Sequence, residues 1–149
     1  MDWPVEFGEG LQVLRYRPGA EYKPHYDYFD PAHAGTPNIL KRGGQRVGTV
    51  VMFLNTPELG GAPTFPDVHL EVAPVKGNAV FFSYDRAHPM TRTLHGGAPV
   101  VQGEKWVATK WMRQRRFVGA KKDEKEDVSS PSIERDPAKT KSPAKRDFG

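Results

Sequence analysis

The 149-residue sequence contains no cysteine. Disulfide bonds, thiolate metal sites and cysteine nucleophiles are therefore excluded, and any bound metal ion must be held by His, Asp, Glu or water. A chain without disulfides suits a reducing compartment, so we expect a cytoplasmic protein.

Long apolar runs are also missing. No stretch approaches the ~20 residues that a membrane-spanning helix needs, and the N-terminus lacks the charged-then-apolar pattern of a signal peptide. The formal net charge is +4 and the pI is about 9.4, but Lys and Arg are interleaved with Asp and Glu instead of forming a basic stripe. We expect neither a membrane nor a nucleic acid as partner.

Helical periodicity is nearly absent from residues 1–117, which we interpret as one domain. Short runs rich in β-branched and aromatic residues recur there, separated by Gly and Pro, at 10–17, 22–29, 47–55, 68–73, 78–84 and 105–112. This spacing predicts an all-β sandwich or barrel. The segment 30–46 is rich in Pro and Gly, and we interpret it as a loop that acts as a lid.

The composition changes at residue 118. Residues 118–149 contain eight Lys or Arg, seven Asp or Glu and few large apolar residues. Such a segment buries too little apolar surface to offset the entropy of ordering it, so we predict a disordered charged tail.

The most informative local pattern is the pair His25 and Asp27, which lies in the aromatic-rich run 22–29. Side chains at i and i+2 of a strand share one face, so this imidazole and this carboxylate can bind one metal ion. With a second His they would form the 2-His-1-carboxylate set of non-haem Fe(II) sites, which leaves positions open for substrate and oxygen. The pair alone is weak evidence, because His and Asp are common at strand ends and turns.

The second His has four candidates, His33, His69, His88 and His95, and spacing alone does not select one. His95 is followed by two glycines, which leave room for a small ligand.

A second informative charged residue, besides Asp27, is the lysine at the start of the predicted strand 105–112. Period two places Lys105, Val107, Thr109 and Trp111 on one face of the run 105–112. If that face points inward, the ammonium needs an anion such as a carboxylate or phosphate. A solvent-exposed lysine at a strand end is an equally good interpretation.

Taken together, these motifs resemble the catalytic domain of the prolyl 4-hydroxylases, which are Fe(II)- and 2-oxoglutarate-dependent dioxygenases. The resemblance covers residues 11–117 approximately. It is carried by Leu11-Gln-Val-Leu-Arg-Tyr16, His25-Tyr-Asp-Tyr-Phe29, Gly43-Gly-Gln-Arg-Val47, Gly60-Gly-Ala-Pro-Thr-Phe-Pro66, Lys76-Gly-Asn-Ala-Val-Phe-Phe82, Leu94-His-Gly-Gly97 and Lys105-Trp-Val-Ala-Thr-Lys-Trp111.

The resemblance implies a double-stranded β-helix, or jelly roll, with few or no helices. It implies that His25, Asp27 and His95 bind Fe(II), and that Lys105 pairs with the distal carboxylate of 2-oxoglutarate.

The same resemblance suggests further contacts. Tyr16 and Thr64 would hydrogen-bond to the cosubstrate, and Tyr22, Arg46 and Trp111 match positions near the peptide substrate.

The implied activity is hydroxylation of peptidyl proline at C4, with consumption of O2 and release of succinate and CO2. The partner would be a proline-containing peptide or protein, and a need for ascorbate is left open. Two alternatives remain: the same chemistry on a different substrate, and a non-catalytic jelly-roll module that binds metal.

Two features depart from the family pattern. The chain starts almost at the first core strand, whereas family members usually have a preceding helical segment that packs on the larger sheet. We therefore expect uncovered apolar sheet surface, with self-association as one consequence. In addition, Ala62 and Pro63 stand where an acidic residue is common.

Overall fold

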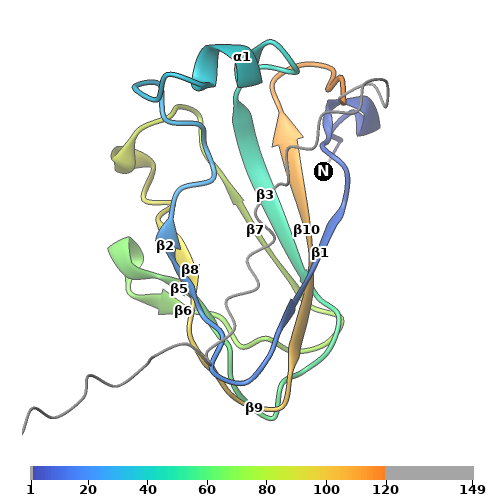
Figure 1. Cartoon of the computed structure of the whole chain (residues 1–149), viewed down its shortest axis with the longest axis vertical. Helices are drawn as coiled ribbons and strands as arrows, with labels where there is room; N and C mark the ends of the chain where they lie inside the picture. Colours follow the sequence, from blue (N-terminus) through green and yellow to red (C-terminus); the bar gives the residue numbers. More distant parts are fainter. Residues whose placement is uncertain (1, 120–149) are drawn as a thin grey trace, which may run out of the picture. The chain divides into compact units, whose positions relative to one another are not determined.

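The computed structural model describes residues 2–119. Two four-stranded antiparallel sheets form the framework of this region (Figure 1). The large sheet has the order β1-β10-β3-β7, with bounds Gln12–Tyr16, Lys105–Arg113, Arg46–Phe53 and Ala79–Ser83. The small sheet has the order β2-β8-β5-β6, with bounds Tyr22–His25, His95–Gly97, Pro63–Phe65 and Leu70–Glu71.

A third, two-stranded sheet joins β4 (Leu59–Gly60) to β9 (Val100–Gln102). Strands that are distant in sequence are neighbours in both larger sheets, as in a jelly roll. The predicted all-β core is therefore confirmed. The predicted disordered tail lies outside the described residues, except for Val118 and Gly119.

Among residues 2–119, helical structure is limited to short segments. These are α1 (Thr36–Leu40) and the 3-10 turns Val5–Phe7, Pro66–Val68 and Pro89–Thr91. In the part of the chain that the structure describes, no helix has the length and apolar character needed to cross a membrane.

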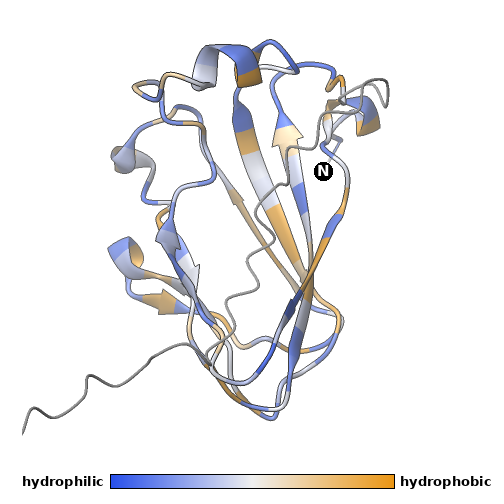
Figure 2. Cartoon of the chain, in the orientation of Figure 1, coloured by the Kyte–Doolittle hydropathy of each residue, from blue (hydrophilic) through white to orange (hydrophobic). Residues whose placement is uncertain are grey.

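The inner face of the large sheet carries the core. Phe53 on β3 lies opposite Val107 on β10, and both side chains are buried. Phe65 contributes from the small sheet and is also buried. Figure 2 shows a polar start and a largely hydrophobic remainder for β3. Burial of these apolar side chains fixes which face of each strand points inward.

The opposite face of the large sheet exposes apolar side chains. Val13, Phe81 and Trp106 alternate with inward-facing neighbours and are 52%, 48% and 38% exposed. This agrees with the expected uncovered sheet surface. The self-association inferred from it stays a prediction.

Several predicted strands have different limits. The predicted run 22–29 ends as a strand at His25, so Asp27 lies in a bend beyond it. The run 68–73 forms only the two-residue β6. The predicted strands did not include β4, β5, β8 and β9, because strands of only two or three residues show no readable alternation.

A carboxylate from the N-terminal segment ties this segment to β3 and β10. Glu9 accepts hydrogen bonds from Arg46 at 2.8 and 2.9 Å, and its Oε1 accepts from Arg113 at 2.9 Å. Arg113 is only 2% exposed and also donates to the carbonyls of Gly44 and Ile39. Burial opposes ionisation of Glu9, but the two guanidinium groups outweigh it and hold the pKa of this carboxyl below its ordinary value.

We expect Glu9→Gln to lower the free energy of unfolding by roughly 2–3 kcal/mol, because it leaves two largely buried guanidinium groups without their anion. Urea unfolding at neutral pH measures the effect. Glu6→Gln is the matched control, since Glu6 is exposed and forms no salt bridge among the described residues. Equal stability of the two variants would contradict this role for Glu9.

Candidate active site

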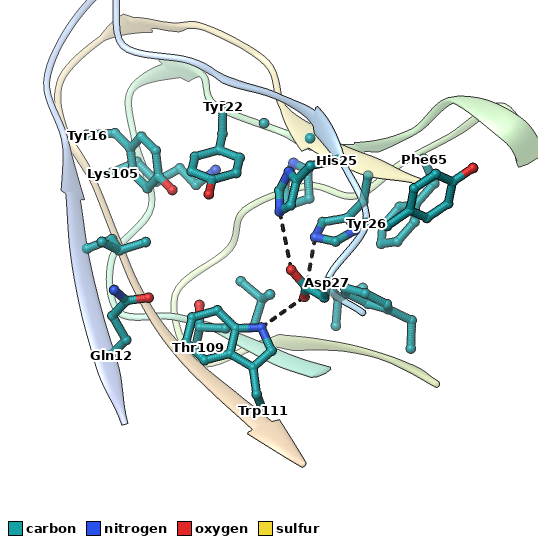
Figure 3. Close-up of a pocket in the computed structure, with 18 of the residues that line it drawn as sticks. Gln12, Tyr16, Tyr22, His25, Tyr26, Asp27, Phe65, Lys105, Thr109 and Trp111 are labelled. Carbon is teal, nitrogen blue, oxygen red and sulfur yellow. Dashed lines mark hydrogen bonds and ion pairs between the residues drawn. The ribbon is translucent and has the colours of Figure 1, made fainter. Parts of the chain in front are cut away.

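A pocket of about 400 Å³ is lined by residues from both four-stranded sheets (Figure 3). This volume suits a small molecule. Of the residues that the sequence predicts for the site, all except Thr64 line this pocket.

Two histidines and one aspartate meet at one side of the pocket. His25 on β2 and His95 on β8 are directly paired in the sheet register, so their rings project side by side. Asp27 follows β2 and turns its carboxylate toward both rings (Figure 3). His25 Nε2 lies 3.3 Å from Asp27 Oδ1, and His95 Nε2 lies 3.5 Å from Oδ2. One ligand atom from each residue lies within 4.8 Å of the others, a spacing that fits one metal ion.

The orientation of both imidazole rings suits metal binding. His25 Nδ1 lies 3.0 Å from the carbonyl oxygen of Lys23, and His95 Nδ1 lies 2.8 Å from that of Thr93. A carbonyl only accepts hydrogen bonds, so Nδ1 carries the hydrogen and Nε2 keeps its lone pair. Metal-binding histidines are commonly oriented by a hydrogen bond of this kind.

Asp27 is 6% exposed but has several polar partners. Its Oδ2 accepts hydrogen bonds from Thr49 Oγ1 at 2.7 Å and from Trp111 Nε1 at 3.0 Å. Burial raises the pKa of Asp27, but the neighbouring His25 and His95 side chains and these two donors outweigh it and lower the pKa to about 2.

The pKa of His95 is lowered, chiefly by burial. A neutral imidazole beside an ionised carboxylate is the protonation state that a metal ion requires. Two nitrogen ligands and one carboxylate fit Fe(II).

Lys105, at the first residue of β10, is 5% exposed. Its Nζ donates to the carbonyl of Gly61 at 2.7 Å and lies 5.0 Å from the centre of the Tyr16 ring. Within residues 2–119, no carboxylate lies at salt-bridge distance from this ammonium. Burial lowers the pKa of Lys105 to about 8 and raises that of Tyr16 to about 12.

The environment of Lys105 therefore favours an anion from outside the chain. A Cβ built on Gly97 would lie 3.4 Å from Lys105 Nζ, so the glycine keeps space open beside the ammonium. Tyr16 keeps its phenolic proton at neutral pH and can donate to such an anion. These features fit the predicted cosubstrate, 2-oxoglutarate.

Thr64 is the predicted site residue that does not line the pocket. It lies on β5 between Pro63 and Phe65, and these two neighbours do line it. Alternation along the strand turns Thr64 to the other face, opposite Gly96 in the register. The structure therefore does not support the predicted contact between Thr64 and the cosubstrate.

The three predicted substrate residues all line the pocket. The Tyr22 ring packs edge-on against His25. Arg46 stacks on Trp111 at 4.2 Å and donates to the Asp27 carbonyl at 3.3 Å. In this structure Arg46 and Trp111 both contact Asp27, and their roles toward a peptide stay predictions.

The segment 30–46, which the sequence predicts to be a lid, does not cover the pocket in the expected way. No residue from 28 to 45 lines the pocket. The two ends of this segment are joined by hydrogen bonds between Gln45 and the backbone of Phe29, at 2.7 and 2.9 Å. Its helix contacts the end of β10, where Arg113 donates to the Ile39 carbonyl at 3.0 Å. The structure does not support the lid interpretation.

Sequence reasoning missed four residues around this site: Glu9, Thr49, Tyr84 and Arg113. Thr49 falls within a predicted strand, but only the pairing of β3 with β10, which sets Thr49 opposite Trp111, brings it to Asp27. The positions of these four residues depend on contacts between segments far apart in the sequence, and the spacing of residues along the chain does not reveal such contacts.

Comparison with known protein families defines the class of this site. The sequence pattern of the 2OG-Fe(II) oxygenase superfamily matches residues 11–113, which include every residue of the metal cluster and Lys105. The chain therefore belongs to the 2OG-Fe(II) oxygenase superfamily.

Within this superfamily, the similar proteins are prolyl hydroxylases. Prolyl 4-hydroxylase 1 from Arabidopsis thaliana is 46% identical over 129 residues, covering 75% of this chain and 43% of that protein. A putative prolyl 4-hydroxylase from Acanthamoeba polyphaga mimivirus is 36% identical over 119 residues, covering 76% and 48%. The chain thus spans less than half the length of these two relatives.

A solved structure shares the fold. The viral collagen prolyl hydroxylase of Paramecium Bursaria Chlorella virus-1, in complex with 2OG, is 38% identical and superposes with a TM-score of 0.57. The match covers 71% of this chain and 59% of that chain. This likeness confirms the resemblance to prolyl 4-hydroxylases inferred from the sequence and the jelly-roll assignment.

The lowered pKa of Lys105 predicts how cosubstrate binding depends on pH. Only the ammonium form pairs with a carboxylate, so above about pH 8 the affinity for 2-oxoglutarate should fall about tenfold per pH unit. Fluorescence titration of the Mn(II)-loaded protein from about pH 7 to about pH 9.5 measures this slope. Lys105→Arg is the control, because a guanidinium stays protonated throughout this range. A wild-type affinity that does not change with pH would contradict the prediction.

Proposed function

We propose that this chain catalyses Fe(II)- and 2-oxoglutarate-dependent hydroxylation of peptidyl proline at C4. The single observation that carries the proposal is that one pocket holds both the His25, Asp27 and His95 cluster and the buried ammonium of Lys105. A metal site next to a buried cation suits a ketoacid that binds the metal at one end and the protein at the other.

The cluster would hold Fe(II) through one atom from each of its three residues. Bound Fe(II), with 2-oxoglutarate and O2, would supply the oxidising chemistry that hydroxylates the substrate and releases succinate and CO2.

The side chains of the chain itself would supply position and charge. Lys105 would neutralise the distal carboxylate of the cosubstrate, and Tyr16 would donate a hydrogen bond to it. The apolar parts of the pocket, including Phe65 and Val80, would restrict water at the reacting end.

The substrate class follows from the relatives and not from the pocket alone. The similar proteins are named prolyl 4-hydroxylases, and the solved neighbour is a collagen prolyl hydroxylase. We therefore propose a proline-containing peptide or protein as the substrate of this chain.

The test combines three measurements on the same protein. Anaerobic addition of Fe(II) and 2-oxoglutarate should give a visible charge-transfer band. O2 should then release succinate in the presence of proline-rich peptides, and mass spectrometry should find one added oxygen on C4 of proline. A peptide with Ala in place of Pro is the control.

Each negative outcome selects an alternative. A charge-transfer band and succinate release without peptide oxidation would favour the same chemistry on a different substrate. No band and no succinate would favour a non-catalytic metal-binding module.

A further inference from the structure

Two buried hydroxyl groups form a hydrogen-bonded chain behind the metal-site carboxylate. Thr49 on β3 is 0% exposed, and its Oγ1 lies 2.7 Å from Asp27 Oδ2. Tyr84, directly after β7, is 3% exposed, and its hydroxyl lies 3.1 Å from Thr49 Oγ1. The hydroxyl groups of Thr49 and Tyr84 therefore link β7 and β3 to the metal-site carboxylate that follows β2.

The direction of these hydrogen bonds follows from the chemistry of the groups. A carboxylate that serves as a metal ligand is ionised and only accepts hydrogen bonds, so Thr49 must donate its single proton to Asp27. The Thr49 oxygen then has only lone pairs to offer Tyr84, and the phenol must donate to it. The main chain of Tyr84 is held beside β3, because Tyr84 N donates to the Val47 carbonyl at 3.0 Å.

The two oxygens of Asp27 have different surroundings as a result. Oδ2 accepts from Thr49 and from Trp111 Nε1, which matches the lone pairs available on one carboxylate oxygen. Oδ1 faces His25 Nε2 at 3.3 Å and accepts from neither donor. His95 Nε2 lies 3.5 Å from Oδ2, but it keeps its lone pair and donates no hydrogen bond there. The arrangement leaves Oδ1 as the oxygen available to an ion.

We propose that Thr49 and Tyr84 are positioning residues that restrict Asp27 to coordination through Oδ1. A carboxylate that bound the ion through both oxygens would occupy a further coordination position. The Tyr84 to Thr49 chain occupies Oδ2 and so keeps that position open. The purpose of an open coordination position rests on the proposed function. The test of the inference, however, measures metal binding and not hydroxylation.

Thr49→Val tests the chain with a side chain of the same shape. It removes both hydrogen bonds, and we expect the affinity for Mn(II) to fall about 10- to 100-fold, as for other residues that orient metal ligands. Tyr84→Phe removes only the more distant donor, and we expect a decrease of about threefold. Thr49→Ser keeps the hydroxyl and should bind Mn(II) like the wild type.

The relaxation rate of water protons in the presence of bound Mn(II) distinguishes a role in positioning Asp27 from a general loosening of the fold. If Oδ2 joins the ion in Thr49→Val, one of about three metal-bound waters is displaced, and the relaxivity per bound ion falls by about a third. Thr36→Val is the matched control. Thr36 is 3% exposed, and its hydroxyl donates to the Asp30 carbonyl at 2.6 Å, outside the pocket. The Thr36→Val variant should be less stable than the wild type but should have the same Mn(II) affinity and relaxivity.

Wild-type affinity and relaxivity in folded Thr49→Val would overturn the proposal. If Thr49→Val does not fold, the Tyr84→Phe variant provides the test. An unchanged Mn(II) affinity of Tyr84→Phe would then overturn the proposal. Mn(II) binding by the wild type without prolyl hydroxylation would overturn the proposed function and leave this inference standing. A wild type that binds no Mn(II) would overturn the inference.

Discussion

Asp27→Asn is expected to lower the affinity of the pocket for a divalent ion by at least about 100-fold. The substitution keeps the shape of the side chain but removes the only negative charge in the cluster. Thr49 and Trp111 both donate to Oδ2, so an amide group there would meet two hydrogen-bond donors. Either its NH2 group would oppose them, or its oxygen would satisfy them and its NH2 group would replace Oδ1 at the metal position.

Competition with a coloured chelator measures this loss with Mn(II), without requiring turnover. Asp85→Asn is the control, because Asp85 is an exposed aspartate that pairs with the neighbouring Arg86. Prolyl hydroxylation should fall in parallel with metal occupancy in Asp27→Asn. Retention of wild-type Mn(II) affinity would remove Asp27 from the metal site.

Lys105→Ala is expected to abolish coupled turnover while leaving metal binding nearly intact. The ammonium is 5% exposed and has no carboxylate partner within the described region, so its charge is available to the cosubstrate. Loss of a charged hydrogen bond in a buried site costs about 2–4 kcal/mol, or about 30- to 1,000-fold in affinity for 2-oxoglutarate.

Titration of the Mn(II)-loaded variant with 2-oxoglutarate, followed by succinate release from the Fe(II) form, measures both effects. Lys23→Ala is the matched control, because Lys23 belongs to β2 beside the metal site but is exposed. Unchanged turnover in Lys105→Ala would disprove its pairing with the cosubstrate. Loss of Mn(II) binding in the same variant would show that Lys105 supports the metal site instead.

The parts of the site that the sequence predicts are those carried by local spacing or by a motif. His25 and Asp27 are two residues apart, and both belong to the candidate metal cluster even though the strand ends between them. Period two predicted that Lys105 and Trp111 share one face of β10, and both line the pocket, but it did not predict that this face points inward. The choice of His95 among four histidines came from the resemblance to a family.

What the sequence does not predict depends on strand register. His95 meets His25 because β8 pairs with β2, and β8 is only three residues long. The same short-strand problem affects Thr64, whose direction depends on which face of the three-residue β5 points inward. Thr49 reaches Asp27 through the packing of three separate segments, and no local pattern encodes that meeting.

The direct pairing of His25 with His95 has a consequence for the stability of the small sheet. The two strands share only two register pairs, and one of these is the pair of histidines. An ion held by both side chains would act as a cross-link between β2 and β8, joining residues 70 positions apart in the sequence. Because such an ion binds only the folded arrangement, occupancy would favour the closed sheet by mass action, and separation of the two strands would release the metal.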